Sequence, residues 1–201
     1  MVFGIDIDGV LTDIEHYQLE IGGRFFRKKY NIEPVDPAGY EITDIFGMGK
    51  RGFYAFWSRH LFSYARKERS REGARQCLTR LADDGHSLHI ITKRAMSDWR
   101  GPLGMLMRFI VRRWLEREGI PYDSITYCSG NKLREVRQFG VDAMIDDSPR
   151  IIRALMGQCA IICFDAAYNR DITGEGVYHA GSWDEVYDVC RRLSEAQARP
   201  V

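Results

Sequence analysis

The amino-acid sequence predicts an α/β protein, with a Rossmann-like three-layer α/β/α core, a parallel sheet, and a small helical cap inserted after the first strand. Two observations predict the core: short apolar runs recur along the chain, and amphipathic segments separate them. A third observation predicts the cap. About sixty residues without a strand pattern separate the first apolar run from the helix expected to follow it, which is far longer than an ordinary loop.

Five apolar runs of strand length are predicted to form the sheet. They lie at residues 2–7, 87–92, 124–127, 142–146 and 160–164. The first run ends in two aspartates and a glycine, a pattern typical of a buried strand followed by a tight turn. Each later run follows a segment of helical pattern, so we expect the strands to be parallel and to be covered on both faces by the crossover helices.

Five amphipathic segments are predicted to be the helices of the core. They lie at residues 71–83, 106–118, 131–139, 149–156 and 183–196. Glycines close to the ends of the first four mark their C-termini, since glycine adopts the left-handed conformation that ends many helices. Ser182 and Glu185 have the spacing of a capping box at the start of the last helix.

The segment 13–72 breaks this alternation and is predicted to be the cap. It contains no clear strand pattern and is rich in aromatic and basic residues. We therefore predict a catalytic core of residues 1–12 and 73–201, with a helical cap of residues 13–72. The cap aromatics either stack on a substrate or form the core of the cap itself. Phe25 and Phe26 are the candidates for substrate contact among them.

Composition excludes several classes of protein. The 201 residues carry a net charge of +1, which argues against a nucleic-acid partner and against a membrane surface. The longest apolar stretch, 102–111, is too short to span a bilayer, and the N-terminus lacks the pattern of a signal peptide. Five cysteines without a CxxC pair are expected to be free thiols, so we predict a cytoplasmic protein.

Polar residues follow the predicted strands at the edge of the sheet where ligands bind in α/β proteins. Asp6 and Asp8 end the first strand, Thr92 ends the second, and Asp146 and Asp147 end the fourth. Carboxylates gathered at one point repel each other, so we expect a hard cation between them, and Mg²⁺ prefers oxygen ligands.

The chemistry available to this set is phosphoryl transfer. An aspartate can attack phosphorus and form an acyl-phosphate, and a second carboxyl two residues later can act as general acid and base. Thr92 and Lys132 can hold the phosphate oxygens. Lys93 and Arg94, which follow Thr92, are further candidates for substrate contact. The partner is therefore predicted to be a small phosphorylated metabolite.

The chain resembles the haloacid dehalogenase (HAD) superfamily. Its segment 6–13, DIDGVLTD, is similar to the first motif of that superfamily, Thr92 to the second, Lys132 to the third, and Asp146 with Asp147 to the fourth. A closer resemblance is to the 5′-nucleotidase, or deoxyribonucleotidase-like, branch. The segments 114–125 and 144–149 carry that resemblance, together with Lys132.

The resemblance implies a role for each acid. Asp6 would be the nucleophile and a metal ligand, and Asp8 the general acid and base, with its backbone carbonyl on the metal. Asp146 would be a further ligand. Asp147 would ligate through water or orient Lys132. The expected function is Mg²⁺-dependent hydrolysis of a small phosphomonoester, for which a nucleoside 5′-monophosphate is the first choice.

Three alternatives stay open at this point. A sugar-phosphate phosphatase would use the same chemistry. A phosphatase acting on nucleic-acid ends would require an open site, whereas a cap of this size is expected to close the site to polymers. A protein that keeps the fold only to bind a ligand would have no need of an acid at position 8. The sequence does not predict the oligomeric state.

Overall fold

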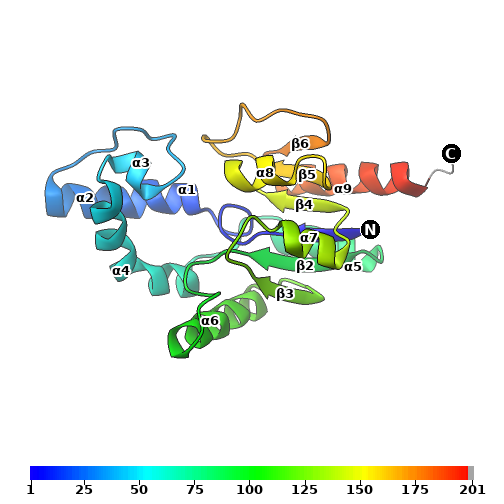
Figure 1. Ribbon diagram of the computed structural model, residues 1–201, viewed down its shortest axis with the longest axis horizontal. Helices are drawn as coiled ribbons and strands as arrows, with labels where there is room; N and C mark the ends of the chain where they lie inside the picture. Colours follow the sequence, from blue (N-terminus) through cyan, green and yellow to red (C-terminus); the bar gives the residue numbers. More distant parts are fainter. Residues whose placement is uncertain (199–201) are drawn as a thin grey trace.

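The computed structural model describes residues 1–198, and its core is a six-stranded parallel sheet in the order β3-β2-β1-β4-β5-β6 (Figure 1). The strands are β1 (Val2–Ile5), β2 (Ser87–Thr92), β3 (Ser124–Tyr127), β4 (Ala143–Asp146), β5 (Ala160–Phe164) and β6 (Val177–Ala180). All neighbouring strands are parallel. The predicted fold class is confirmed.

Strand β6 was not predicted from the sequence. Its four residues have an exposed middle, and only Ala180 is fully buried, so the apolar run that marks the other strands is absent. The strand forms because it pairs with β5 at the edge of the sheet, an interaction that the local sequence does not encode.

Five helices cover the sheet: α5 (Ala74–Asp83), α6 (Pro102–Glu118), α7 (Leu133–Phe139), α8 (Pro149–Leu155) and α9 (Trp183–Ala198). Helix α6 begins four residues before the predicted start, since Pro102 occupies its first turn, where proline is well tolerated. Helix α7 begins two residues after its predicted start, because Lys132 adopts a left-handed conformation with φ +65°.

Two hydrophobic clusters define the layers. Residues of α5, α6 and α9 pack with one face of the sheet, and residues of α7 and α8 pack with the other. Side chains of β1 alternate accordingly: Phe3 and Ile5 belong to the first cluster, while Gly4 faces the second. A Cβ at Gly4 would lie 2.6 Å from the sulfur of Met144 and 3.3 Å from side-chain atoms of Ile91 and Val141, so a larger residue would require these side chains to shift.

The segment between β1 and α5 is helical, as predicted, and lies at the left of Figure 1. It contains α1 (Ile14–Tyr17), a π-helical turn η1 (Gln18–Gly22), α2 (Gly23–Tyr30), α3 (Ile42–Phe46) and α4 (Gly49–Lys67). Its buried side chains form a separate hydrophobic cluster, in which the rings of Phe26 and Phe46 stack 4.4 Å apart. The predicted boundary positions themselves stay predictions, and residues 199–201 of the predicted core lie outside the described residues.

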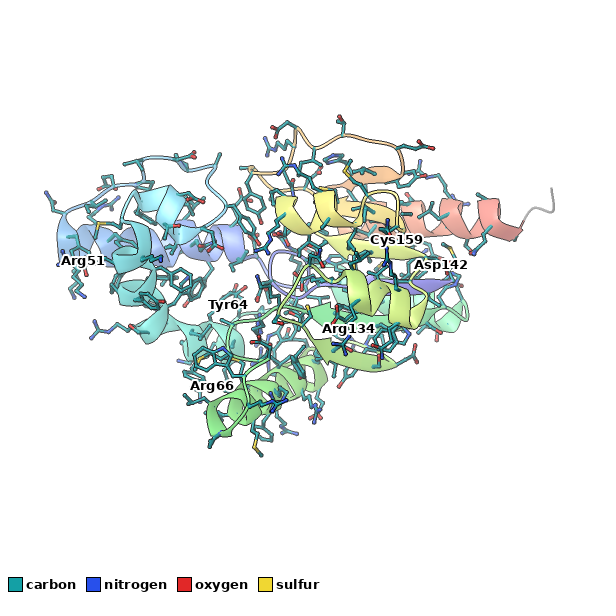
Figure 2. All side chains as sticks on the ribbon, viewed as in Figure 1. Arg51, Tyr64, Arg66, Arg134, Asp142 and Cys159 are labelled. Atoms are coloured by element: carbon teal, nitrogen blue, oxygen red, sulfur yellow. The ribbon has the colours of Figure 1, made fainter. Side chains whose placement is uncertain are left out.

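Helix α4 is the longest in the cap and reaches the core. Its N-terminal part contributes Phe56 to the cap cluster, whereas Ala65 near its end belongs to the cluster shared with α5 and α6. Tyr64 points toward the core at the base of this helix (Figure 2). Its hydroxyl lies 2.7 Å from the hydroxyl of Thr12, which follows the first strand. None of the described helices is long and apolar enough to cross a membrane.

Candidate active site

The acids of the candidate site converge at the centre of the sheet. Strand β1 pairs with β2 on one side and with β4 on the other, so this is the switch in strand order at which α/β proteins bind ligands. Ile5 is paired with Ile145, and the Asp6 amide continues the ladder by donating to the Ile145 carbonyl at 3.0 Å. Asp6 and Asp146 are therefore brought side by side.

Lys132 connects these two acids. Its ammonium lies 2.9 Å from Asp6 Oδ1 and 2.7 Å from Asp146 Oδ2, and its side chain is almost fully buried. Burial lowers the pKa of Lys132, but the charges of Asp146 and Asp6 outweigh it and raise the pKa above the usual range for lysine. Burial raises the pKa of Asp6 to about 6, against the opposing effect of Lys132. The lysine stays charged and compensates only part of the negative charge.

Asp147 completes a group of three carboxylates. Oxygens of Asp6, Asp146 and Asp147 all lie within 4.8 Å of one another. Burial, followed by the charges of Asp146 and Asp6, raises the pKa of Asp147 well above its usual range. Asp147 Oδ1 is buried without a hydrogen-bond partner in the described residues. A buried acceptor without a partner among clustered carboxylates fits a hard divalent cation, so these residues fit Mg²⁺.

Gly9 explains how Asp147 comes so close to the first strand. Its φ is +86°, and a Cβ at this position would lie 2.0 Å from Asp147 Oδ2. Any side chain would therefore collide with the carboxylate and be strained in its backbone. A glycine at position 9 is therefore needed for Asp147 to pack against the turn after β1.

Asp8 lies outside the group of three carboxylates. Its carboxylate accepts from Arg94 Nε at 3.0 and 3.2 Å and also pairs with Arg94 Nη2. Arg94 is 2% exposed, and its remaining nitrogen, Nη1, is buried without a partner in the described structure. The guanidinium lies 5.2 Å from the ring of Tyr64, so a cap residue packs directly on this pair. The predicted role of the Asp8 backbone carbonyl as a metal ligand stays a prediction.

The two residues before Arg94 differ in exposure. Thr92 is fully buried at the end of β2, and its hydroxyl accepts from the Arg94 amide at 3.3 Å. Lys93 is exposed, and its charge lowers the pKa of Glu41 in the cap, against the dominant effect of burial, which raises it. Lys93 is thus placed at the boundary between core and cap.

The structure does not bring Phe25 and Phe26 to the carboxylates. Phe26 is fully buried in the hydrophobic cluster of the cap, and the ring of Phe25 packs edge-on against it at 5.1 Å. The packing supports the alternative that these aromatics form the core of the cap. Contact with substrate stays a prediction for both residues.

Four residues that the sequence analysis did not select lie at the site. Tyr40 and Tyr64 come from the cap, and Tyr168 and Asn169 come from the loop after β5. The Tyr168 hydroxyl donates to Asp147 Oδ2, and Asn169 Nδ2 donates to the Asp147 carbonyl at 2.8 Å. The rule that ligands bind at strand ends could have indicated the two loop residues. No local pattern distinguishes the two cap tyrosines from the other cap aromatics.

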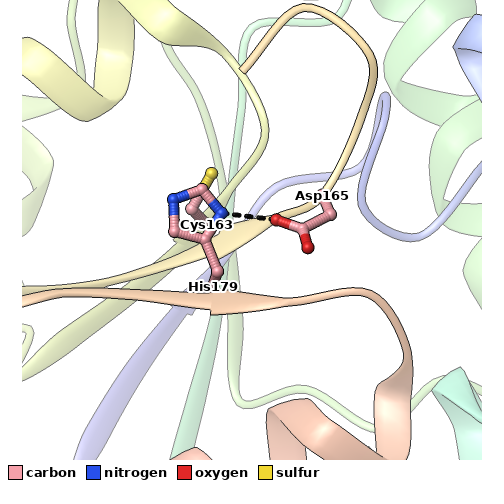
Figure 3. A group of neighbouring side chains, drawn as sticks. All are labelled: Cys163, Asp165 and His179. Carbon is pink, nitrogen blue, oxygen red and sulfur yellow. Dashed lines mark hydrogen bonds and ion pairs between the residues drawn. The ribbon is translucent and has the colours of Figure 1, made fainter. Parts of the chain in front are cut away.

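A second group of potential metal ligands lies near the ends of β5 and β6, where Cys163, Asp165 and His179 come together (Figure 3). Both ring nitrogens of His179 have partners: Nδ1 pairs with Asp165, and Nε2 donates to the Ile172 carbonyl at 2.7 Å. A histidine that donates from both nitrogens is an imidazolium and offers no lone pair to a metal. This group therefore ties the loop between the two strands to β6.

This ion pair predicts a pH dependence of stability. Partial burial lowers the pKa of His179, but the hydrogen bonds to Ile172 and Asp165 outweigh it and raise the pKa. The stabilisation is present below the usual histidine pKa of about 6.5 and is lost as pH rises through the raised value. Between pH 6 and pH 9 we expect the wild-type melting temperature to fall by about 2–4 °C more than that of His179→Gln. Calorimetry checks this, with His16→Gln as a surface control; parallel curves for wild type and His179→Gln would contradict it.

Comparisons with known proteins identify a family and relatives of this chain. A family model described as "5′ nucleotidase, deoxy (Pyrimidine), cytosolic type C protein" matches residues 1–197. A curated protein of Chlorobaculum tepidum named "Putative 5′(3′)-deoxyribonucleotidase" is 28% identical over 200 residues, which are 95% of this chain and 90% of that protein.

Solved structures share the fold. A HAD-superfamily hydrolase from Geobacter sulfurreducens has a TM-score of 0.56 at 15% identity and covers 94% of this chain and 95% of its own. The D,D-heptose 1,7-bisphosphate phosphatase from B. bronchiseptica, complexed with magnesium and phosphate, has a TM-score of 0.54 at 14% identity, with coverages of 95% and 98%. At these identities the likeness concerns the fold alone.

Proposed function

This chain belongs to the family of cytosolic type C deoxy (pyrimidine) 5′ nucleotidases, and on that premise we propose that it hydrolyses nucleoside 5′-monophosphates through a covalent aspartyl-phosphate on Asp6, with Mg²⁺ as cofactor. The observation that carries the proposal is the grouping of Asp6, Asp146 and Asp147 around the buried ammonium of Lys132. Hydrolysis of phosphate esters is the activity of the family. The intermediate, the cofactor and the nucleotide substrate are the proposal.

Asp6 is the nucleophile. One of its carboxylate oxygens attacks the substrate phosphorus, and an O–P bond forms while the bond to the leaving oxygen breaks. Lys132 lies 2.9 Å from this carboxylate and reduces the repulsion between it and the anionic phosphate. The buried hydroxyl of Thr92, at the end of the neighbouring strand, is a donor for a phosphate oxygen.

Asp8 is the general acid and base. In its protonated form it donates a proton to the leaving oxygen, and the resulting carboxylate then takes a proton from the water that hydrolyses the aspartyl-phosphate, so that inorganic phosphate leaves and Asp6 is restored. Arg94 pairs with Asp8, and its free Nη1 is the donor that remains for a substrate oxygen. Lys93, at the boundary with the cap, adds positive charge where an anionic substrate enters.

Asp6, Asp146 and Asp147 would hold the magnesium ion together with the Asp8 backbone carbonyl. When bound, the ion would neutralise the carboxylates and polarise the phosphoryl group. The unpartnered Oδ1 of Asp147 supports this assignment.

Aromatic cap residues that pack beside Tyr64 support a leaving group with a flat face. Tyr17 and Trp57 stack at an interplanar angle of 14°, and Tyr17 also packs on Tyr64, whose ring lies beside Arg94. Aromatic side chains stack on a nucleobase for roughly 1–3 kcal/mol. We therefore assign discrimination among leaving groups to this tyrosine and tryptophan pair rather than to Phe25 and Phe26. The partner is a small phosphorylated metabolite, and five unpaired cysteines support a cytoplasmic location.

A panel of substrates tests the proposal. With Mg²⁺ present, kcat/KM for the best nucleoside 5′-monophosphate is expected to exceed that for a hexose phosphate by about tenfold or more, since stacking of about 1.4 kcal/mol corresponds to a factor of ten. Release of inorganic phosphate measures both rates, and excess chelator is expected to reduce them to background. A preference for the hexose phosphate would support the sugar-phosphate alternative. Binding without release of phosphate would support a protein that only binds its ligand.

A further inference from the structure

The loop between β5 and β6, residues 165–176, returns to the active site at Tyr168 and Asn169. Asn169 is fully buried and uses all of its amide group: Nδ2 donates to the carbonyls of Asp147 at 2.8 Å and Phe164 at 2.9 Å, and Oδ1 accepts from the Ala166 amide at 2.9 Å. Asn169 therefore fixes the loop to the backbone of Asp147. Tyr168, the preceding residue, is held in a defined position as a result.

Tyr168 contacts only one of the two carboxylate oxygens of Asp147. Its hydroxyl donates to Oδ2, and Oδ1 is buried without a partner in the described residues. A carboxylate without this contact could rotate about its last bond, and either oxygen could then face the other acids. The hydrogen bond restricts that rotation, so Oδ2 is held by Tyr168 and Oδ1 is left as the oxygen without a protein partner among the described residues.

The cap contacts the same loop in two places. The ring of Tyr40 packs edge-on against that of Tyr168 at 4.9 Å, and Glu15 Oε1 accepts from the Ala167 amide at 3.0 Å. Gln18, which is buried in the cap, donates to the Tyr40 carbonyl at 3.3 Å and fixes the position of that residue. The ring of Tyr168 is thus supported from the cap, and its hydroxyl is aimed at the core.

We propose that Tyr168 is a positioning residue for the metal site: by donating to Oδ2 of Asp147 it orients that carboxylate so that Oδ1 is available to Mg²⁺ or to one of its waters. The inference rests on the proposed function, because it concerns the same ion. It adds a role for a residue outside the four motifs, and it assigns the loop after β5 to the assembly of the cation site. Hydrogen-bond partners of metal ligands typically change metal affinity by 10–100-fold when removed.

The test compares Tyr168→Phe with wild type in the absence of substrate. The variant keeps the ring that contacts Tyr40 and loses only the hydroxyl. Mn²⁺ serves as the probe, followed by the EPR signal of the free ion, and Mg²⁺ is then measured by competition. We expect the Kd of both ions to rise by roughly tenfold. Tyr178→Phe is the matched control, since Tyr178 lies on β6 with 38% of its surface exposed, and its Kd is expected to equal that of wild type.

A double-mutant cycle separates action through Asp147 from a general loss of structure. In the background Asp147→Asn, the change Tyr168→Phe is expected to add less than about a twofold effect, because the carboxylate that it orients is gone. Equal Kd values for wild type and Tyr168→Phe would overturn the inference and leave the proposed function intact. If Tyr178→Phe weakened binding as much as Tyr168→Phe, the inference would also fail. Absence of Mn²⁺ and Mg²⁺ binding to the wild type would overturn both.

Discussion

Replacement of Asp6 by Asn is expected to lower kcat by roughly 10⁴-fold or more, while the fold is retained. An amide has nearly the same shape as the carboxylate, but it cannot form the acyl-phosphate. Asp6 is 8% exposed and lies among two other buried acids, so its charge is unfavourable in the metal-free protein. Lys132 keeps its second partner, Asp146, at 2.7 Å. We therefore expect the melting temperature of the variant to equal or exceed that of wild type.

Two measurements check this result. The first is steady-state release of phosphate, with Asp188→Asn as the control, since Asp188 is an exposed carboxylate on α9. The second is mass spectrometry of rapidly quenched wild type with substrate, which is expected to find one phosphoryl group on the peptide that contains Asp6. Activity of Asp6→Asn near the wild-type rate, or a phosphoryl group on another residue, would remove Asp6 from the role of nucleophile.

Asp8→Asn is expected to lower kcat by about 10²–10⁴-fold for an alkyl phosphate ester, since this is the usual contribution of a general acid and base. The aryl oxide group of an aryl phosphate ester can leave without being protonated. The rate of aspartyl-phosphate formation should therefore be partly restored with an aryl ester. Hydrolysis of the intermediate also needs Asp8 as a base, and it is expected to stay slow. The predicted signature is a burst of aryl alcohol followed by slow turnover.

The decisive quantity is the ratio of the alkyl to the aryl rate of aspartyl-phosphate formation, measured in the burst phase, because this ratio does not depend on the fraction of folded enzyme. That matters here, since Arg94 is 2% exposed and loses its charged partner in this variant, so some loss of stability is expected. Equal losses in the rate of aspartyl-phosphate formation for both kinds of ester would show that Asp8 positions Arg94 and is not the acid.

Five of the six strands and the carboxylate group follow from simple rules of sequence. Strands β2, β3 and β5 lie at the predicted residues, since long apolar runs between helical segments have few alternatives. Asp6, Asp146 and Asp147 meet because parallel strands end at one edge, and Lys132, which was also predicted from the sequence, lies against two of these acids.

Contacts that depend on tertiary packing could not be predicted by such rules. Phe26 and Tyr64 belong to the same aromatic-rich segment, yet one is enclosed in the cap and the other lies on Arg94. Their sequence neighbourhoods do not distinguish these outcomes, because which face of a helix meets the core depends on how the whole segment packs. Tyr168 was missed for a related reason, since it acts through Asp147 and resembles no motif of its own.

The anchoring of α4 in both hydrophobic clusters limits how the enzyme can open. A cap joined to its core by flexible linkers could swing as a rigid body, but here one 19-residue helix has Phe56 in the cap cluster and Ala65 in the core cluster. A wide swing would have to bend this helix or pull its last turn away from α6, at the cost of buried apolar contacts. Small tilts of the cap about the base of α4 would break fewer of these contacts, so we expect the cap to move with low amplitude. We therefore expect the stiffness of α4 to limit the size of the substrate that can enter, before any side chain contacts the leaving group.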